Sequence, residues 1–513
     1  MRLSWFVAPL FAALCVPACG SRSPLDPGTE EPPPIECTLD AECGSDACGK
    51  GRCQDGFCEF VAIDCDDDDS CTEDACNPAT GCVHRPMTVD NDGDGHNAPR
   101  PGYAPGESGA CGDDCDDAAT AARPGGKEVC DGRDNDCNGV VDDGSLYRSS
   151  EAGPVRLSSA NAERAGHGGL IGLEGGFALT MRERNANDPT EWQTFLKGID
   201  EDGAPRFDSR VSMPNVPIDF GPLAWSGREL VTVWEDDRTS GGYEIWFARF
   251  TPDGAKLGPD VRVTESEQFS LNPSLLYNRN EFVMVWDDRR DELRGTEGSR
   301  LYGQRISPEG DAIGGNVLLT PDEQGVEYPS LAIGAHRIGA AYTQFVAPAG
   351  STLRFRSYDA ELAPAAVSES FGSDVDDPSV EALETGFAVL WENRTDGPGN
   401  VLWGALFDEE AKMLVEPVAL ASGASHLNDH SAISLGDRLL VVWSDDSSGN
   451  YDLYWQMFDS RLAPLGERAA ITANSSDTIG PSLAVSASGS VGVSYEDYAD
   501  GSRQVYFTRL LCE

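Results

Sequence analysis

An internal repeat fills residues 153–513 of this chain. Seven copies follow one another at a spacing of about 52 residues, and a repeat of that length is one supersecondary unit that buries its apolar surface by stacking on its neighbours. In four copies an apolar strand ends in tryptophan followed by acidic or amide residues, at Trp234, Trp286, Trp391 and Trp443. Three degenerate copies have Met181, Tyr342 and Tyr495 at this position.

Each copy contains the signals of four short strands. A strand that opens with proline precedes the apolar strand, as at Pro273 and Pro329, and two further strands separated by a tight turn follow it. The last copy ends after its third strand, and Gly153–Ser158, before the first copy, resembles the missing fourth strand. The sequence therefore predicts a mainly β fold, with residues 147–513 forming a seven-bladed β-propeller closed by an N-terminal strand. A solenoid that does not close is the structural alternative.

The N-terminus has the pattern of an export signal. Met1-Arg2 is followed by an apolar stretch from Trp5 to Val16 and by Val16-Pro-Ala-Cys19. This resembles a bacterial lipoprotein signal over residues 1–18, which implies that Cys19 is lipidated and that residues 19–35 form a Pro-rich tether. The resemblance implies anchoring in the bacterial cell envelope, at the outer membrane. An ordinary secretory signal with an incidental cysteine is the alternative.

Charge restricts the possible partners. The formal net charge of −49 argues against nucleic acids and anionic membrane surfaces, because both would repel the chain. Residues 36–144 contain 27 acidic and 7 basic residues, so this segment carries far more than its share of the charge. Bound cations would make such a density of carboxylates tolerable.

The cysteines cluster in the same segment. An exported chain uses such clusters as a disulfide framework in small domains that lack a core, whereas a zinc site is the competing reading. Residues 36–86 resemble the short Cys-rich repeats of bacterial exported proteins, and Cys43–Cys58 resembles a Dickkopf-type or EGF-like knot; we expect little regular structure here. The predicted disulfide cysteines are Cys37, Cys43, Cys48, Cys53, Cys58, Cys65, Cys71, Cys76, Cys82, Cys111, Cys115, Cys130, Cys137 and Cys512.

Residues 87–146 carry the sharpest motif. Val89–Gly144 resembles the MopE-type metal-binding motif of bacterial surface proteins. Two stretches place oxygen ligands at alternating positions before a glycine, which wraps a hard cation such as calcium. Copper, which the family name implies, and acidic turns that bind nothing are the alternatives. The predicted ligands are Asp90, Asp92, Asp94, Asp134, Asp136, Asn138, Asp142 and Asp143.

One rim of the predicted propeller gathers polar side chains from successive copies. Asp237, Arg238, Asp288, Arg289, Arg394, Asp377 and Asp429 are candidates for a ligand-binding rim. The simpler interpretation is structural: residues that recur in every good copy pin the hairpins or bridge neighbouring blades. His167 and His430 are expected near the same rim, where a pair of metal ligands is conceivable.

These features favour a non-enzymatic, envelope-anchored binding protein. Its calcium-binding, Cys-rich stalk would present the propeller to a protein or glycan ligand. A glycoside hydrolase of the sialidase type is the alternative suggested by the recurring arginines, but the sialidase Ser-x-Asp-x-Gly-x-Thr-Trp box is absent from the sequence. A copper-binding surface protein and a structural spacer are further possibilities, and nothing in the sequence identifies the ligand.

Overall fold

The computed structural model describes residues 35–126, 133–139, 146–148, 153–185, 188–211, 221–238, 242–266, 268–291, 298–346, 350–393, 400–422, 426–436 and 438–512. Several predicted features lie outside these residues: the signal, Cys19, the tether up to residue 34, Cys130, Asp142, Asp143, Arg394 and the side chain of Cys512. No helix within the described ranges has the length and hydropathy needed to cross a bilayer.

The chain divides into two compact units. The first contains the described residues up to Val89, with Arg100–Tyr103 and Ser108–Cys111, and the second contains the others up to the C-terminal strand. The first unit has a short 3-10 turn, η1 (Asp40–Glu42), a three-stranded sheet and a two-stranded hairpin. Its strands are β1 (Ser45–Asp46), β2 (Gly49–Gln54), β3 (Phe57–Ala62), β4 (Thr72–Asn77) and β5 (Gly81–Pro86). The hairpins give residues 36–86 more regular structure than expected.

Disulfide bonds hold this segment together, as predicted. Within the described residues the pairs are Cys37–Cys53, Cys43–Cys58, Cys48–Cys76, Cys65–Cys82, Cys71–Cys111 and Cys115–Cys137. Cys48–Cys76 joins the three-stranded sheet to the β4–β5 hairpin. Cross-links of this kind replace a large apolar core in small exported domains.

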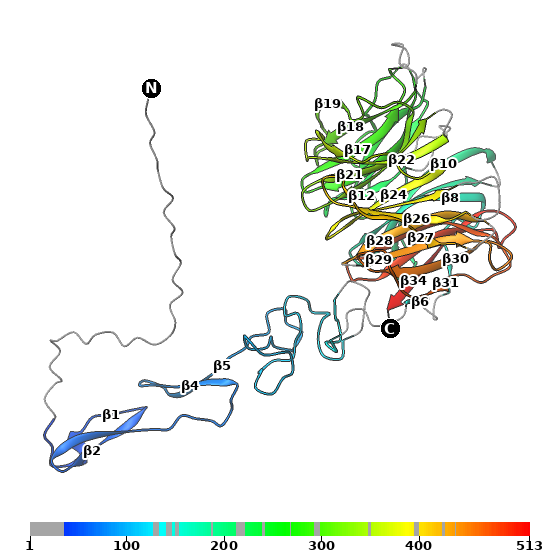
Figure 1. Ribbon diagram of the computed structural model, residues 1–513. Coiled ribbons are helices and arrows are strands. Elements are labelled where there is room, and N and C mark those ends of the chain that lie inside the picture. Colours follow the sequence, from blue (N-terminus) through cyan, green and yellow to red (C-terminus); the bar gives the residue numbers. More distant parts are fainter. Residues whose placement is uncertain are drawn as a thin grey trace, which may run out of the picture. The chain divides into compact units, whose positions relative to one another are not determined.

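The second unit is built from antiparallel sheets that follow one another along the chain (Figure 1). Six described sheets have four strands each, joined in chain order. Their strands are β8 (Ala162–Leu173), β9 (Gly176–Asn185), β10 (Asp188–Asp200), β11 (Pro205–Arg210); β12 (Leu223–Trp225), β13 (Leu230–Asp236), β14 (Glu244–Phe250), β15 (Val261–Arg262); β16 (Ser270–Asn278), β17 (Glu281–Asp288), β18 (Arg300–Ile306), β19 (Ala312–Leu318); β20 (Val326–Ile333), β21 (Ile338–Val346), β22 (Gly350–Tyr358), β23 (Pro364–Val367); β24 (Val375–Leu383), β25 (Gly386–Asn393), β26 (Leu402–Phe407), β27 (Met413–Ala421); and β28 (Leu427–Leu435), β29 (Arg438–Asp445), β30 (Asp452–Phe458), β31 (Pro464–Ala470).

A seventh sheet combines the two ends of the second unit's sheet region. It contains β32 (Thr478–Val485), β33 (Val491–Asp497) and β34 (Gln504–Cys512), and β34 pairs antiparallel with β6 (Leu146–Arg148) and β7 (Val155–Arg156). β7 lies inside the segment Gly153–Ser158 that the sequence indicates as the missing fourth strand. This repeated four-stranded architecture makes the chain mainly β and fits a β-propeller.

The apolar core lies between consecutive sheets. In β17, Phe282 to Trp286 are all fully buried, because both faces of the strand are covered by neighbouring sheets. One buried cluster contains Phe177 of the first sheet and Phe507 of the last, whose ring centroids are 5.2 Å apart. The first and last sheets therefore pack on each other as the intervening sheets do.

Candidate functional site

The first acidic loop folds around its own carboxylates. Asp90, Asp92 and Asp94 place one oxygen each within 4.8 Å of the others. The backbone N–H groups of Gly93 and Gly95 donate to the Asp90 carboxylate at 2.7 and 3.0 Å. Gly95 has a φ of +95°, a conformation that a residue with a side chain rarely adopts, so the glycine permits the sharp turn.

Asp114 adds a carboxylate that the sequence analysis missed. Its side chain is 1% exposed, and burial together with the charges of Asp94 and Asp92 raises its pKa above the usual range. In each of Asp92, Asp94 and Asp114, Oδ1 accepts a backbone N–H from the second residue along, at 2.8 to 3.1 Å. The Oδ2 atoms of the same three residues are buried without any hydrogen-bond partner among the described residues.

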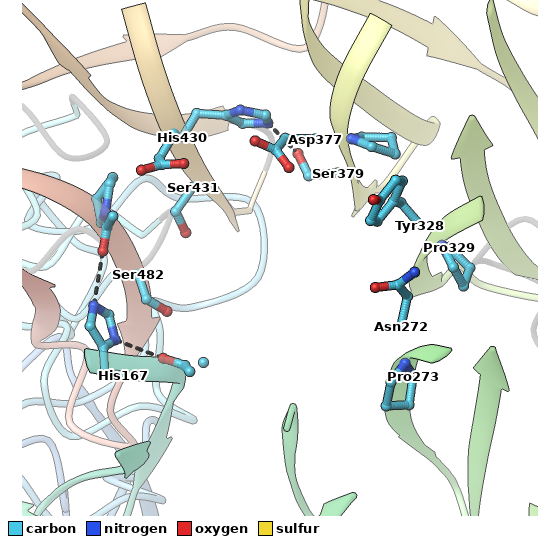
Figure 2. Close-up of a pocket in the computed structure, with 16 residues that line it drawn as sticks. His167, Asn272, Pro273, Tyr328, Pro329, Asp377, Ser379, His430, Ser431 and Ser482 are labelled. Atoms are coloured by element: carbon cyan, nitrogen blue, oxygen red, sulfur yellow. Dashed lines mark hydrogen bonds between the residues drawn. The ribbon is translucent and has the colours of Figure 1, made fainter. Parts of the chain in front are cut away.

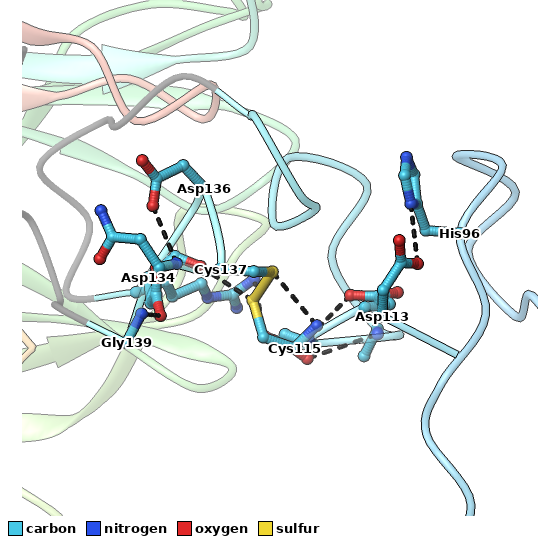
Figure 3. Close-up of a disulfide and its surroundings, with 12 residues drawn as sticks. His96, Asp113, Cys115, Asp134, Asp136, Cys137 and Gly139 are labelled. Atoms are coloured by element: carbon cyan, nitrogen blue, oxygen red, sulfur yellow. Dashed lines mark hydrogen bonds and ion pairs between the residues drawn. A yellow bond between two sulfur atoms is a disulfide. The ribbon is translucent and has the colours of Figure 1, made fainter. Parts of the chain in front are cut away.

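The second acidic loop repeats this arrangement at Asp134 to Gly139 (Figure 3). The Asp134 carboxylate accepts the N–H groups of Asn138 and Gly139 at 3.0 and 2.7 Å, and Asp136 also accepts from Asn138 at 3.0 Å. The Cys115–Cys137 disulfide links this loop to the residue that follows Asp114. The predicted ligands of the two loops are thus brought together as two clusters, apart from Asp142 and Asp143, which lie outside the described residues.

The donor set of these loops suits a hard cation. The orphaned oxygens of Asp92, Asp94 and Asp114 are carboxylate atoms, and calcium prefers oxygen ligands. Softer donors are few nearby: Cys115 is in a disulfide, and His96, whose Nδ1 lies 3.0 Å from Asp113 Oδ1, is a lone imidazole among several carboxylates. The residues present therefore fit calcium better than copper.

A small acidic and histidine cluster occurs in the first unit, where the sequence analysis proposed no site. His84 Nδ1 lies 2.6 Å from Asp74 Oδ1 and 3.2 Å from Asp67 Oδ2. The hydrogen bond that the His84 ring donates to Asp74 raises the pKa of His84, and the same bond lowers the pKa of Asp74. Asp74 and His84 lie on the β4–β5 hairpin and Asp67 lies in the segment before β4.

The innermost strands of the sheets line a second candidate site, a cavity of about 510 Å³ that is open to solvent (Figure 2). The lining comes from β8, β16, β20, β24, β28 and β32 and includes His167, Asn272, Tyr328, Asp377, Asp429, His430 and several prolines and serines. Pockets of 300 to 1,000 Å³ commonly hold small organic ligands or peptide side chains. Asp377 and Asp429, two of the predicted rim residues, are among the lining residues.

A shared bulge positions these side chains. Asn272, Tyr328, Asp377 and Asp429 all adopt a left-handed backbone conformation, with φ between +43° and +55°. Each lies at a point where the pairing register of the inner strand shifts. Such bulges turn a side chain out of the regular alternation of a strand. Three of the four precede a proline, so the proline signal in the sequence marks the bulge.

The serine after each bulge connects neighbouring sheets. Ser330 Oγ accepts the backbone N–H of Val380 at 3.1 Å, and Ser431 Oγ accepts that of Leu483 at 3.1 Å. Ser482 of the last sheet accepts the N–H of Leu170 in the first at 2.9 Å. The recurring Pro-Ser pair is therefore explained by sheet packing.

The two cavity histidines are occupied by protein contacts. His430 Nδ1 lies 3.0 Å from Glu392 Oε1, and its Nε2 lies 2.9 Å from Ser379 Oγ. His167 Nε2 lies 2.9 Å from the Gly480 carbonyl oxygen. Both rings join adjacent sheets, so neither has a nitrogen directed at a shared metal ion.

The other predicted rim residues that the structure describes do not line the cavity. Arg238 Nε donates to Asp236 Oδ2 at 2.6 Å, while the guanidinium carbon lies 4.2 Å from the ring centroid of Trp246. Asp236 Oδ2 also accepts from the buried Trp234 Nε1 at 3.2 Å. This set of contacts pins the hairpin between the second and third strands, which is the structural interpretation of the repeat.

The third sheet, β16 to β19, corrects the alignment of the repeats that the sequence suggested. Asp288 is fully buried and accepts from Trp286 Nε1 at 2.8 Å and from Arg290 Nη2 at 2.6 Å. Arg290, not Arg289, is therefore the counterpart of Arg238. Side chains alternate between the two faces of a strand, so the acidic residue two positions after the tryptophan lies on the same face as the tryptophan. Arg289 instead pairs with Glu327 at 3.1 Å. Asp237 is exposed, and Arg394 lies outside the described residues.

Comparisons with known proteins match separate parts of the chain. Residues 114–143 match a family model described as "Putative metal-binding motif", of the copper-binding MopE type, which confirms the C-terminal part of the motif predicted over Val89–Gly144. Residues 64–87 match the Dictyostelium (slime mold) repeat. Protein psiQ of Dictyostelium discoideum is 37% identical over 70 residues, which are 14% of this chain and 7% of psiQ.

Solved structures resemble the sheets at low sequence identity. The acylaminoacyl peptidase of Pyrococcus horikoshii is 12% identical with a TM-score of 0.39; the match covers 66% of this chain and 50% of the peptidase. The Hadza microbial sialidase Hz136 is 12% identical with a TM-score of 0.39, and the match covers 62% of this chain and 73% of the sialidase. The chain thus spans about half the length of the peptidase it matches.

Proposed function

We propose that this protein is an exported, lipid-anchored binding protein with two working parts. Its acidic loops hold calcium and stiffen a disulfide-rich stalk, and its sheets form a closed, seven-bladed β-propeller that binds a protein or glycan ligand. The observation that carries the first part is the set of buried, unpartnered Oδ2 atoms of Asp92, Asp94 and Asp114.

An electrostatic argument connects these oxygens to a cation. A buried carboxylate without a partner costs several kcal/mol, and nearby carboxylates add repulsion. Asp92, Asp94 and Asp114 each direct one oxygen to a nearby backbone N–H and leave the other unsatisfied, which is the arrangement of a ligand cage. A divalent cation would satisfy all three oxygens at once.

Contacts between the first and last sheets support a closed propeller. Ser482 accepts from Leu170 across this junction, as Ser431 accepts from Leu483 between two consecutive sheets. Glu201, in the turn between β10 and β11, accepts hydrogen bonds from Ser486 and Ser490, in the turn between β32 and β33, at 3.1 and 2.9 Å. A ring of blades has no free sheet edge between its ends, which removes a site of aggregation.

A binding role suits the inner cavity better than catalysis does. Two of the arginines that suggested a sialidase-type hydrolase are engaged elsewhere: Arg238 pins a hairpin and Arg289 pairs with Glu327. A hydrolase of that type needs arginines that converge on the carboxylate of its substrate. The lipid anchor at Cys19 and the outer-membrane location follow from the N-terminal sequence pattern.

Calcium binding is tested by titrating the metal-free, oxidised full chain with calcium or copper in a calorimeter, followed by thermal melts. We expect calcium to bind and raise the melting temperature of the acidic segment, and Asp114→Asn to weaken binding at least tenfold. Asp322→Asn, an exposed change of the same charge, is the control. Equal calcium affinity of the Asp114→Asn variant and the parent chain would contradict the site, and tighter copper binding would contradict the choice of metal.

A further inference from the structure

We propose that the cavity among the inner strands binds an organic cation, a primary ammonium or guanidinium group. This inference deepens the proposed function because it names the chemistry of the ligand at the propeller. It rests on the recognition role and is independent of the calcium loops. The carrying residues are Asp377 and Asp429, with Tyr328, Asn272 and Asp287 beside them.

The size of the cavity selects an organic group over a bare metal ion. The volume is about 510 Å³, whereas one water molecule occupies about 30 Å³ of liquid volume. A single ion would leave most of that space to solvent. A lysine or arginine side chain, or a free polyamine, fills a cavity in this range.

The charge of the lining selects a cation. Asp377 and Asp429 lie on the adjacent inner strands β24 and β28, and the described lining contains neither lysine nor arginine. The lining histidines are held by protein groups, His430 by Glu392 and Ser379. Figure 2 shows Asp377, Tyr328, Asn272 and Ser431 around the same open space.

The Asp429 carboxyl is poorly compensated by the protein. Burial, together with the charges of Glu392 and Asp377, raises its pKa to about 6, although His430 lowers it. Within the part of the chain that the structure describes, its Oδ2 accepts a hydrogen bond from Asn428 Nδ2 at 2.8 Å. A bound ammonium group would supply the positive charge and the donors that this carboxylate lacks.

A second, independent observation comes from the wall behind Asn272. Asp287 is 1% exposed; its Oδ1 accepts Asn272 Nδ2 at 2.7 Å and the Tyr328 N–H at 3.4 Å, whereas its Oδ2 has no partner among the described residues. Burial raises the pKa of Asp287 to about 7. A carboxyl with one unsatisfied oxygen thus contacts two residues that line the cavity, Asn272 and Tyr328.

Tyr328 supplies the remaining recognition element. Its side chain is 47% exposed although it lines the cavity, and its left-handed backbone turns it out of the strand. The face of an aromatic ring attracts an ammonium or guanidinium group within about 6 Å of the centroid. A large exposed aromatic beside carboxylates is the combination that cation-binding sites use.

Isosteric substitutions can test this without disturbing the fold. Asp377→Asn with Asp429→Asn removes two charges, and asparagine tolerates the left-handed conformation of both positions. The probes are spermidine, a tetralysine peptide and the same peptide with its amino groups acetylated. Binding to the oxidised, calcium-saturated full chain is measured by calorimetry at about 0.15 M salt, which screens long-range attraction.

We expect spermidine or tetralysine to bind the parent chain, the acetylated peptide not to bind, and the double variant to bind at least about tenfold more weakly. The control is Asp253→Asn with Asp322→Asn, which removes the same charge from exposed turns and should bind like the parent. The stronger of the two cationic probes identifies a free polyamine or a protein side chain as the source.

Three results would overturn the site: equal binding by the double variant and the parent, an equal loss in the control variant, or equal binding of the acetylated peptide. A protein or glycan ligand that binds the double variant unchanged would also overturn the site, while leaving the recognition role of the propeller intact. Tyr328→Leu gives a further check, because it should weaken the cationic probes without changing the melting temperature.

Discussion

The Cys-rich segment and the sheets differ in what surrounds their strands. In β3 of the first unit five of six residues are exposed, whereas in β17 seven of eight are buried. The first kind of strand gains little from apolar burial and depends on cross-links; the second gains most of its stability from packing between sheets. The same chain thus relies on covalent cross-links where its sequence is acidic, and on apolar burial where it repeats.

The largest expected effect comes from a substitution that disrupts the packing between sheets. Trp286→Ala removes a fully buried ring and should destabilise the sheets by about 3 to 5 kcal/mol, since it leaves a cavity between the second and third sheets. Chemical denaturation followed by tryptophan fluorescence measures the loss. Trp246→Ala, at a half-buried position, should cost clearly less. Equal losses in the two variants would mean that burial between sheets does not dominate.

Removing a disulfide bond should destabilise the Cys-rich segment. Replacement of Cys115 and Cys137 by serine opens a loop with a sequence separation of 22 and should cost about 3 kcal/mol locally, and it should weaken calcium binding through Asp114. The melting transition of the sheets should not move. Calorimetric melts resolve the two transitions; a shift of the sheet transition alone would contradict the division into two mechanisms.

The segment Gly153–Ser158, which precedes the first repeat, allows a test whose expected effect is intermediate in size. Leu157 is 9% exposed and packs in the cluster shared by the first and last sheets, so Leu157→Ala should cost about 2 kcal/mol. Leu465→Ala, at a position 40% exposed on an outer strand, should change stability by less than about 0.5 kcal/mol. If both variants melt like the parent chain, the junction between the first and last sheets does not contribute to stability.

A further expected effect depends on pH. Burial raises the pKa of Asp287 to about 7, so the folded chain holds a proton that the unfolded chain releases near pH 4. This carboxyl therefore lowers stability as pH rises from about 4 to about 7, with no further loss above that. Asp287→Asn should gain stability relative to the parent across this window. A difference that is constant with pH, measured by melts in a series of buffers, would contradict the assignment.

Sequence patterns local to one strand predicted the sheets well. The tryptophan anchors at Trp234 and Trp286 are buried as a strand covered on both faces requires, and the glycine-punctuated loop at Asp90 to Gly95 folds around its own carboxylates. Both follow from the periodicity of a few neighbouring residues. The segment that completes the last sheet was also recognisable, because it repeats a strand seen elsewhere in the chain.

Features that depend on distant residues could not be predicted. Asp114 joins Asp92 and Asp94 only through the fold, and its orphaned oxygen has no signature in the sequence. Arg290 was missed in favour of Arg289 because the strand alternation, and not the residue types, decides which arginine reaches Asp288. The cavity depends on bulges in six inner strands. Proline marks several of them, but their left-handed geometry emerges from the packing.

Hydrogen exchange on the oxidised full chain, with calcium and after its removal by a chelator, tests the central claim most directly. The account predicts that removal of calcium accelerates exchange in residues 90–117 and 133–139 and leaves β17 and β29 unchanged. Unchanged exchange in the acidic loops, or an equal acceleration in the sheets, would contradict the claim that cations stabilise one region and apolar packing the other.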